Sequence, residues 1–428
     1  MIHHIGQDHE EEPHATAAAN DHIAPAPRVS VQAYCETENT AAMVRAAADD
    51  RRLGKARLSV HMGGMAAAID AYHTMPTPNV IILETEGHSD ILANLDQLAT
   101  VCDPGTRVVV IGTANDAAPY RELVRRGVND YVIGPVQTID VVRSICSLFS
   151  ASEAVTSGRI IAVVGAKGGV GSSTVAHNVA WAIARDLALD SVVIDLDLAF
   201  GTAGLNYNQD PMQGIANAVF SPDRLDTAVV DRLLSKRTEH LSLLASPASL
   251  EQVYDFGTDA FDSIFDTLRM TTPCIVLDIP HQWSGWTRRA LVGADDILIV
   301  AEPDLANLRN TKNMLNLLKA SRPNDRMPLY CLNQVGMPKR PEIDARGFVK
   351  TVESQPIASI PFDSRMFGMA ANNGQMIAEI SANHRIAKTF LQIARRLTGR
   401  ADTKKPQRSL MSPIMDRFRG KKTRKIVA

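Results

Sequence analysis

The chain has 428 residues, of which 45% are hydrophobic and 21% are charged, and its formal net charge is −2. The length predicts two domains, and the composition is typical of a globular protein, which argues against a disordered or fibrous chain. No apolar stretch approaches the roughly 18 residues that a membrane span needs, and the acidic N-terminus lacks the apolar core of a signal peptide. The five cysteines are scattered without metal-ligand spacing, which favours buried thiols in a reducing cytosol.

Residues 1–27 are expected to be a disordered tail, and residues 28–150 alternate short apolar runs with helical patterns. Strands are predicted at 28–35, 56–62, 78–84, 106–113 and 130–134, and helices at 40–53, 64–74, 118–127 and 138–151. Apolar runs this short suit parallel strands that are buried on both faces. The segment is therefore predicted to be a small doubly wound α/β domain.

This front domain resembles the receiver domain of response regulators, but it departs from the family at the positions that carry its chemistry. Glu84 stands where a receiver has its phosphate-accepting aspartate, and the acidic pair after the first strand is reduced to Glu36. Thr113 matches the family's hydroxyl position, whereas Gly134 replaces the lysine before Pro135. A glutamate at that reach cannot form the usual acyl phosphate, and without the lysine little would stabilise one. The resemblance therefore implies a degenerate receiver used for docking.

A polar linker is expected at 151–158, followed by a second domain at 159–399 and a basic tail at 400–428. Strands of the second domain are predicted at 159–166, 190–197, 240–246, 273–280, 295–303, 328–335 and 356–363. Helical patterns separate most of these runs, which predicts a larger, mainly parallel sheet with covering helices. The tail carries ten basic and two acidic residues, so a basic segment follows an acidic body.

A glycine-rich stretch, GAKGGVGSST, joins the first strand of the second domain to a helix. Such a turn offers backbone N–H groups and the positive end of a helix dipole to phosphate. The residues expected to contact nucleotide are Gly165, Lys167, Gly168, Gly169, Val170, Gly171, Ser172, Ser173 and Thr174. Ser173 is placed to bind Mg²⁺, and Thr174 is placed to reach the α-phosphate. The common phosphate loop has lysine where this chain has Ser172.

The early lysine, Lys167, makes this stretch similar to the deviant loop of the MinD/ParA family of P-loop ATPases. The resemblance implies a P-loop α/β fold, Mg-ATP as the bound cofactor, and a homodimer in which Lys167 touches the partner's nucleotide. It also implies that Asp197 orients the attacking water and that Asp195 supports the Mg²⁺ site. Asp278 ends an apolar strand and would hold Mg²⁺ through water.

Two further residues match the family's base-binding positions. Asn333 follows an apolar strand where the family reads the amide edge of adenine, and Pro361 matches a loop that packs on the base. Together with the carboxylates and the glycine-rich loop, these residues predict a nucleotide site at one edge of the sheet. Because Ser172 cannot place a positive charge between the β- and γ-phosphates, nucleotide binding is expected to survive better than hydrolysis.

A receiver-like front domain before this loop narrows the resemblance to the CpaE/TadZ proteins of Flp/Tad pilus assembly. Residues 165–185, 195–211 and 243–252 look especially close to the CpaE branch. The resemblance implies a cytoplasmic localisation and assembly factor, at a cell pole or the inner face of the membrane. Its implied partners are the pilus secretion machinery and polar localisation proteins.

Three alternatives bear on this interpretation. One is a MinD/ParA-type positioning ATPase that hydrolyses ATP robustly while cycling on membrane or DNA, against which Ser172 argues. Another is a two-component regulator, disfavoured by the degenerate receiver site and by the lack of a DNA-reading motif, so nucleic acid is not an expected partner. The third concerns the tail at 409–428, which is either a short basic amphipathic segment that contacts anionic lipid or a disordered basic tail.

Overall fold

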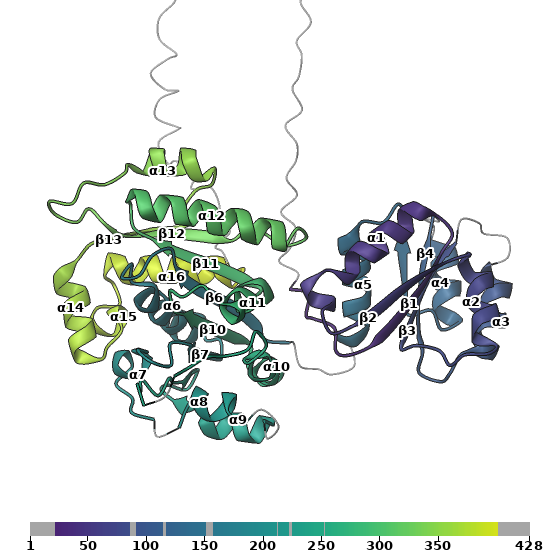
Figure 1. Cartoon of the computed structure of the whole chain (residues 1–428), viewed down its shortest axis with the longest axis horizontal. Coiled ribbons are helices and arrows are strands. Elements are labelled where there is room, and N and C mark those ends of the chain that lie inside the picture. The colour runs from purple at the N-terminus through teal and green to yellow at the C-terminus, as the bar shows by residue number, and fades with distance from the viewer. Residues whose placement is uncertain are drawn as a thin grey trace, which may run out of the picture.

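The computed structural model describes residues 22–85, 91–113, 117–150, 157–211, 213–221, 225–251 and 253–400. Figure 1 shows two α/β domains, a smaller one formed by the N-terminal part of the chain and a larger one formed by the rest. Both contain a mainly parallel sheet with helices on its faces. The α/β fold expected from the sequence is confirmed.

The front domain has a five-stranded parallel sheet in the order β2-β1-β3-β4-β5. Its strands are β1 (Ser30–Cys35), β2 (Arg57–Met62), β3 (Val80–Thr85), β4 (Arg107–Gly112) and β5 (Asp130–Ile133). Its helices are α1 (Glu38–Ala48), the short 3₁₀ helix η1 (Arg51–Leu53), α2 (Gly64–Tyr72), α3 (Ile91–Val101), α4 (Ala117–Arg125) and α5 (Thr138–Ser150). Side chains of α1, η1 and α5 pack on one face of the sheet, and side chains of α2, α3 and α4 pack on the other.

Two expectations for the front domain need correction. The helix predicted at 40–53 is divided, because α1 ends at Ala48 and the carboxylate of Asp50 accepts a hydrogen bond from the Arg52 N–H at 3.0 Å, which starts η1. Aspartate favours such capping positions over helix interiors. In addition, the end of the expected tail packs on the domain: Ala26 is buried, and its N–H donates to the Arg52 carbonyl. Residues 1–21 lie outside the described part of the chain.

The second domain has an eight-stranded sheet in the order β13-β12-β11-β6-β10-β7-β9-β8. Its strands are β6 (Arg159–Gly165), β7 (Ser191–Asp195), β8 (Ser235–Lys236), β9 (Leu241–Leu244), β10 (Cys274–Ile279), β11 (Asp296–Ala301), β12 (Leu329–Val335) and β13 (Ser359–Pro361). The sequence predicts all of these except the two-residue β8, which pairs antiparallel with β9. The other pairings are parallel, so seven strands end at the same edge of the sheet.

Helices cover both faces of this second sheet and bury its β-branched side chains. They are α6 (Ser172–Leu187), α7 (Ala203–Asn206), α8 (Ile215–Val219), α9 (Thr227–Leu233), α10 (Asp262–Thr271), α11 (Gly285–Gly293), α12 (Leu305–Ser321), α13 (Ala345–Val352), α14 (Ser364–Asn373), α15 (Ile377–Ile380) and α16 (Arg385–Leu397). Helices α6, α7, α14, α15 and α16 contribute to the core on one face, and helices α8 to α13 contribute to the core on the other. None of the helices within the described ranges is long and apolar enough to cross a membrane.

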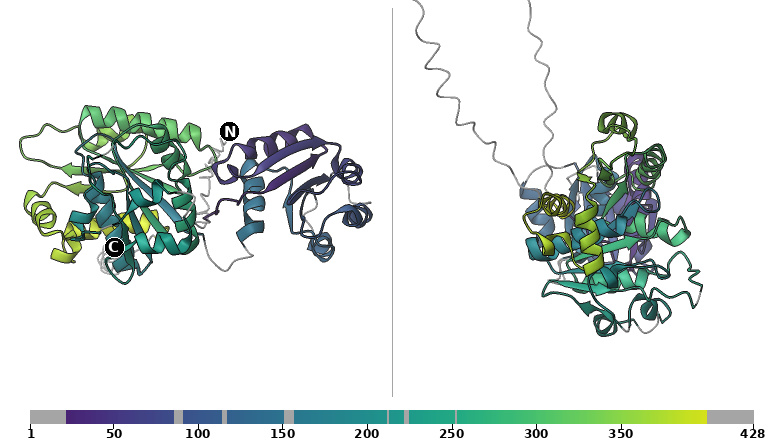
Figure 2. Two further views of the ribbon diagram at one scale, coloured as in Figure 1. Left: turned by 60° about the horizontal axis from the view of Figure 1, so that its bottom comes forward. Right: turned by 90° about the vertical axis from the view of Figure 1, so that its left-hand side faces the viewer.

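The two domains lie side by side in Figure 2 and are joined by a buried ion network. Arg51 of the front domain contacts Asp325 at 2.7 Å and Asp295 at 3.1 Å, and all three side chains are at most 10% exposed. Arg52 also pairs with Asp325, and Asn324 donates to Asp50 at 3.0 Å. The position of the front domain is therefore fixed through η1, an element with little apolar surface.

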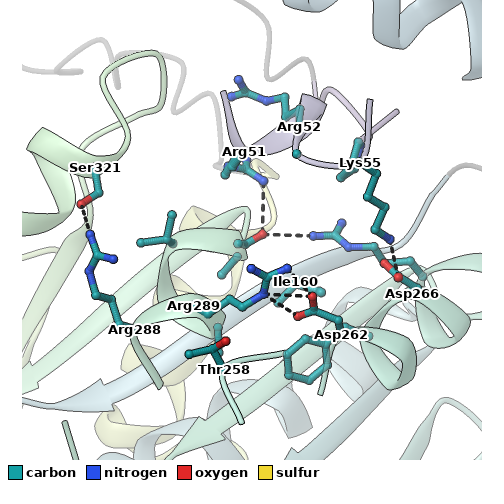
Figure 3. Close-up of a pocket in the computed structure, with 18 of the residues that line it drawn as sticks. Arg51, Arg52, Lys55, Ile160, Thr258, Asp262, Asp266, Arg288, Arg289 and Ser321 are labelled. Atoms are coloured by element: carbon teal, nitrogen blue, oxygen red, sulfur yellow. Dashed lines mark hydrogen bonds and ion pairs between the residues drawn. The ribbon is translucent and has the colours of Figure 1, made fainter. Parts of the chain in front are cut away.

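A cleft of about 770 Å³ lies beside this network, between η1 of the front domain and α10 and α11 of the second domain. Figure 3 shows basic side chains around it, with Lys55 paired to Asp266 and Arg289 paired to Asp262. The cleft reaches Ile160, at the start of β6, whereas the glycine-rich loop follows the end of β6. The cleft is therefore at the opposite edge of the sheet from the candidate site.

Candidate functional site

The glycine-rich loop leaves the central strand β6 at the carboxyl edge of the second sheet and leads into α6. Gly169 and Gly171 have positive φ angles of 84° and 81°, which L side chains rarely adopt. Gly171 is the N-cap residue of α6, in the left-handed conformation and without a side-chain cap. The first N–H groups of α6 and the positive end of its dipole thus point out of the edge of the sheet, where an anion would bind.

The glycines of the loop serve two purposes. A Cβ atom on Gly165 would lie 2.9 Å from the loop's own backbone, and one on Gly171 would lie 2.7 Å from Asn333 Nδ2, so these two allow tight packing. A Cβ on Gly169 would have no heavy atom within 4 Å, and one on Gly168 would meet only His281 at 3.8 Å. The outer side of the loop is therefore open, and its shape fits a phosphate chain lying against backbone N–H groups.

Side chains from neighbouring strands and helices hold the loop from beneath. The donated hydrogen bonds run from Asn310 Nδ2 to the Ala166 carbonyl at 2.8 Å, from Asn333 Nδ2 to the Val170 carbonyl at 2.8 Å and from Gln334 Nε2 to the Gly169 carbonyl at 3.2 Å. Asn333 is buried, and its Oδ1 has no hydrogen-bond partner among the described residues. As placed, Asn333 supports the loop, and its contact with adenine stays a prediction.

Lys167 lies on the outer rim of the loop with its side chain half exposed. Its Nζ atom is 3.4 Å from Oδ2 of Asp304, the N-cap residue of α12. Burial raises the pKa of Asp304, but hydrogen bonds from Asn307 and the charge of Lys167 outweigh it and lower the pKa overall. The ammonium group is thus presented at the surface, away from the interior of its own loop.

Two strand-end carboxylates meet beside the loop. Asp195 of β7 and Asp278 of β10 are register partners, and Asp278 is also the register partner of Val163 in β6. Asp195 is fully buried and accepts hydrogen bonds from the N–H groups of Asp197 and Ala203. Burial and the neighbouring Asp278 raise the pKa of Asp195 to about 6, although these hydrogen bonds act to lower it.

Asp197 and the hydroxyl residues of the loop lie around this carboxylate pair. Asp197 follows β7, is partly exposed, and accepts a hydrogen bond from the Phe200 N–H at 3.0 Å. Ser172, Ser173 and Thr174 form the first turn of α6 and are partly exposed. Mg²⁺ prefers a few oxygen ligands plus water, and Ser173 with Asp278 supplies that donor type at the end of β6. The part of the chain that the structure describes holds no cluster of three or more His, Cys, Asp or Glu side chains suited to a metal.

Pro361 ends β13, the strand next to the one that carries Asn333. It pairs in register with Val335, and the following Phe362 N–H donates to the Val335 carbonyl at 2.8 Å. The topology thus brings Pro361 to the same edge of the sheet as the loop. Its packing on a base stays a prediction.

Sequence reasoning missed His177, which is fully buried one turn into α6. Its Nε2 atom is 3.1 Å from Asp278 Oδ2, and its Nδ1 atom is 2.9 Å from Asn206 Nδ2. Within an apolar helix, a single histidine is indistinguishable in sequence from an ordinary core residue. Only the position of β10 beside β6 reveals its contact with Asp278.

The receiver-like position of the front domain is fully engaged by the protein itself. The carboxylate of Glu84 is buried and accepts hydrogen bonds from the Glu36 N–H, the Thr37 N–H and hydroxyl, and the Thr40 hydroxyl, at 2.5 to 2.9 Å. Burial raises the pKa of Glu84, but these hydrogen bonds outweigh it and lower the pKa overall. The Glu84 side chain therefore connects the end of β3 to the start of α1 through hydrogen bonds.

The chain is similar to several known proteins. Residues 158–328 match the family described as AAA domain. The chain is 25% identical over 248 residues to the septum site-determining protein MinD of Synechocystis sp., covering 56% of this chain and 90% of that protein. A ParA family ATPase from Chlorobium tepidum has a TM-score of 0.50 at 22% identity, covering 56% of this chain and 98% of that one. A structure described as pilus assembly protein CpaE from Caulobacter crescentus is 44% identical, covers 30% of this chain and 98% of that one, and has a TM-score of 0.29.

Proposed function

We propose that the second domain is a MinD/ParA-type P-loop ATPase domain and that this protein is an ATP-dependent dimerising assembly factor with slow hydrolysis. One observation carries the proposal: the only lysine of the loop, Lys167, faces outward at the rim, while Ser172 stands where a lysine would face the phosphates. The chain thus keeps Lys167, the lysine that would contact the nucleotide of a partner subunit. It lacks the lysine at position 172 that would contact its own nucleotide.

Mg-ATP would lie along the open side of the loop. Backbone N–H groups of 168–174 would bind its phosphates, Ser173 would hold the metal directly, and Asp278 would hold it through water. The metal would neutralise charge on the β- and γ-phosphates. Asp197 would orient a water, and Asp195 would hold the backbone on which Asp197 lies, because it accepts the Asp197 N–H at 3.1 Å.

Slow turnover follows from the missing charge. Loss of one preorganised group that stabilises a transition state costs on the order of 3 kcal/mol, or about a hundredfold in rate. Ser172 offers a hydroxyl dipole where phosphoryl transfer calls for a full positive charge. The nucleotide would therefore act as a long-lived ligand that controls assembly, and the rival function, a rapidly cycling positioning ATPase, is disfavoured.

Exposed apolar side chains around the site support a face-to-face dimer. Phe200, Leu205, Trp283 and Leu305 are between 55% and 74% exposed. They follow β7, β10 and β11, whose ends lie at the same edge of the sheet as the loop. Exposed apolar groups at the edge of the sheet that carries Lys167 suit burial against a second copy of the chain.

The finer role proposed is in Flp/Tad-type pilus biogenesis, as a cytoplasmic factor at a cell pole or the inner membrane face. It rests on the CpaE-like segments at 165–185, 195–211 and 243–252 and on the degenerate front domain. With Glu84 engaged by four hydrogen bonds, the front domain would dock on a partner protein without being phosphorylated. The tail at 409–428, whose contact with anionic lipid remains a proposal, lies outside the described residues.

Calorimetry and sedimentation test the central proposal. The full chain should bind Mg-ATP with micromolar to millimolar affinity and should sediment as a dimer only with Mg-ATP. Lys167→Ala should lose this ATP-dependent dimer while its unfolding midpoint stays unchanged. Lys350→Ala, an exposed lysine of α13, is the matched control and should dimerise as wild type does. A folded wild-type chain that binds no ATP, or equal dimerisation by both variants, would contradict the proposal.

A further inference from the structure

We propose that His177 is a positioning residue that couples the segment after Asp197 to the metal-holding carboxylate Asp278. The inference rests on the proposed nucleotide role of the site. It starts from an imidazole that is fully buried in α6 and that contacts a different element through each ring nitrogen.

The two ring nitrogens of His177 contact different partners. The amide nitrogen Nδ2 of Asn206 can only donate, so the His177 Nδ1 atom, 2.9 Å away, accepts. The Nε2 atom lies 3.1 Å from Asp278 Oδ2 without the geometry of a hydrogen bond, so the two groups form a close polar contact. At this distance the imidazole limits the directions in which the Asp278 carboxylate can turn.

A second contact ties the same residue to the region of α7. The hydroxyl of Tyr207, which is fully buried, donates to the His177 carbonyl at 2.8 Å, and the two rings lie 5.4 Å apart. Asn206 ends α7, and Tyr207 follows it directly. The segment thus contacts the Nδ1 atom, the ring and the backbone carbonyl of His177.

The segment at 197–207 is linked to both strand-end carboxylates, Asp195 and Asp278. Its first part is held by Asp195, which accepts the N–H groups of Asp197 and Ala203. Its last part is held by Asp278 through His177. A shift of α7 would therefore rotate the His177 imidazole. This rotation would move the Asp278 carboxylate, which would face the water ligands of the metal. Partners of this kind, one step removed from a metal, commonly change metal affinity by about 10- to 100-fold.

The experiment compares nucleotide binding with and without Mg²⁺ in His177→Ala and His177→Gln. Removal of the imidazole should reduce the Mg²⁺-dependent gain in ATP affinity about tenfold and leave metal-free binding unchanged. Glutamine keeps an N–H donor and should restore part of that gain. Asn206→Ala leaves the buried imidazole in place and should also reduce the Mg²⁺-dependent gain in ATP affinity. Asn373→Ala, at an exposed position of α14, serves as the control.

A second measurement needs no nucleotide. Amide hydrogen exchange of residues 203–207 should speed up in His177→Ala and in Asn206→Ala, while exchange in α13 stays at the wild-type rate. Unchanged exchange at 203–207, or an unchanged Mg²⁺ effect in variants that still bind ATP, would overturn the inference. Absence of ATP binding by the wild type would instead count against the proposed function, and the exchange measurement would still decide the role of His177.

Discussion

Ser172 is the residue on which the proposed slow hydrolysis depends most directly. The loop, the side chains that support it and the nearby carboxylates otherwise fit the proposed nucleotide site. Ser172→Lys should raise ATP hydrolysis by about a hundredfold, because it returns a positive charge to the place where charge develops. Ser172→Ala should leave the slow rate unchanged, since the hydroxyl supplies little of that stabilisation. Phosphate release measured under saturating Mg-ATP checks both, and equal rates for the lysine and alanine variants would show that another part of the site limits turnover.

Glu84 has a structural role in the front domain, where its buried carboxylate accepts four hydrogen bonds. Glu84→Gln should destabilise the front domain by about 2 kcal/mol, because an amide cannot accept all the hydrogen bonds that the buried carboxylate accepts. The pKa of Glu84 is lowered in the folded chain, so its contribution is complete above the unfolded-state pKa. It is lost as the pH falls through the folded-state pKa. Urea unfolding should therefore show a difference between wild type and variant at pH 7 that shrinks in acid.

Helix α12 connects the nucleotide loop with the domain interface. Its N-cap Asp304 pairs with Lys167, its Asn310 holds the Ala166 carbonyl, and Arg322 and Asp325 follow its last turn. Asp304→Asn separates two roles, since asparagine still caps the helix but carries no charge. Folding stability should stay close to wild type, whereas Lys167 should be freed and dimerisation should require less ATP. Sedimentation over an ATP titration measures this, with Asp304→Ala as the variant that also loses the cap. A D304N midpoint at the wild-type ATP concentration would show that the ion pair does not restrain Lys167.

At the level of elements, the sequence predicts the strands well because each central strand is a short apolar run buried on both faces, as in β6 and β10. It predicts the loop because glycine spacing is local. It fails where the structure depends on distant chain segments. The pairing of β10 with β6 brings Asp278 next to His177, and Asp50, which looks helical by periodicity, instead caps η1. The contact of Arg51 with Asp325 likewise has no local signal, because it joins positions in different domains.

Buried ion pairs join the two domains of the molecule at their interface. Burial alone would raise the pKa of Asp325, but Arg51, Arg322 and Arg52 outweigh this effect and lower it. Burial also raises the pKa of Asp295, and Arg269, His22 and Arg51 lower it well below its usual range. Both carboxylates therefore stabilise the joined state at neutral pH and stop doing so as the pH falls through their lowered folded-state values. The front domain should be released in acid before either domain unfolds.

Asp325→Ala tests whether this network sets the arrangement of the two domains. The substitution removes the shared partner of Arg51, Arg52 and Arg322. Arg51 keeps its contact with Asp295 and Arg52 keeps Asp50, but the buried Arg322 loses its carboxylate partner, and breaking a buried ion pair typically costs about 3–5 kcal/mol. Since the network joins two domains that each have their own core, the cost should appear mainly as separation of the domains. Small-angle scattering should show a larger radius of gyration for the variant than for wild type at pH 7, and ATP binding should persist, because the loop lies at the opposite edge of the sheet. Glu239→Ala, at an exposed position, should leave both unchanged. A compact variant with wild-type scattering would show that contacts other than these ion pairs fix the front domain in place.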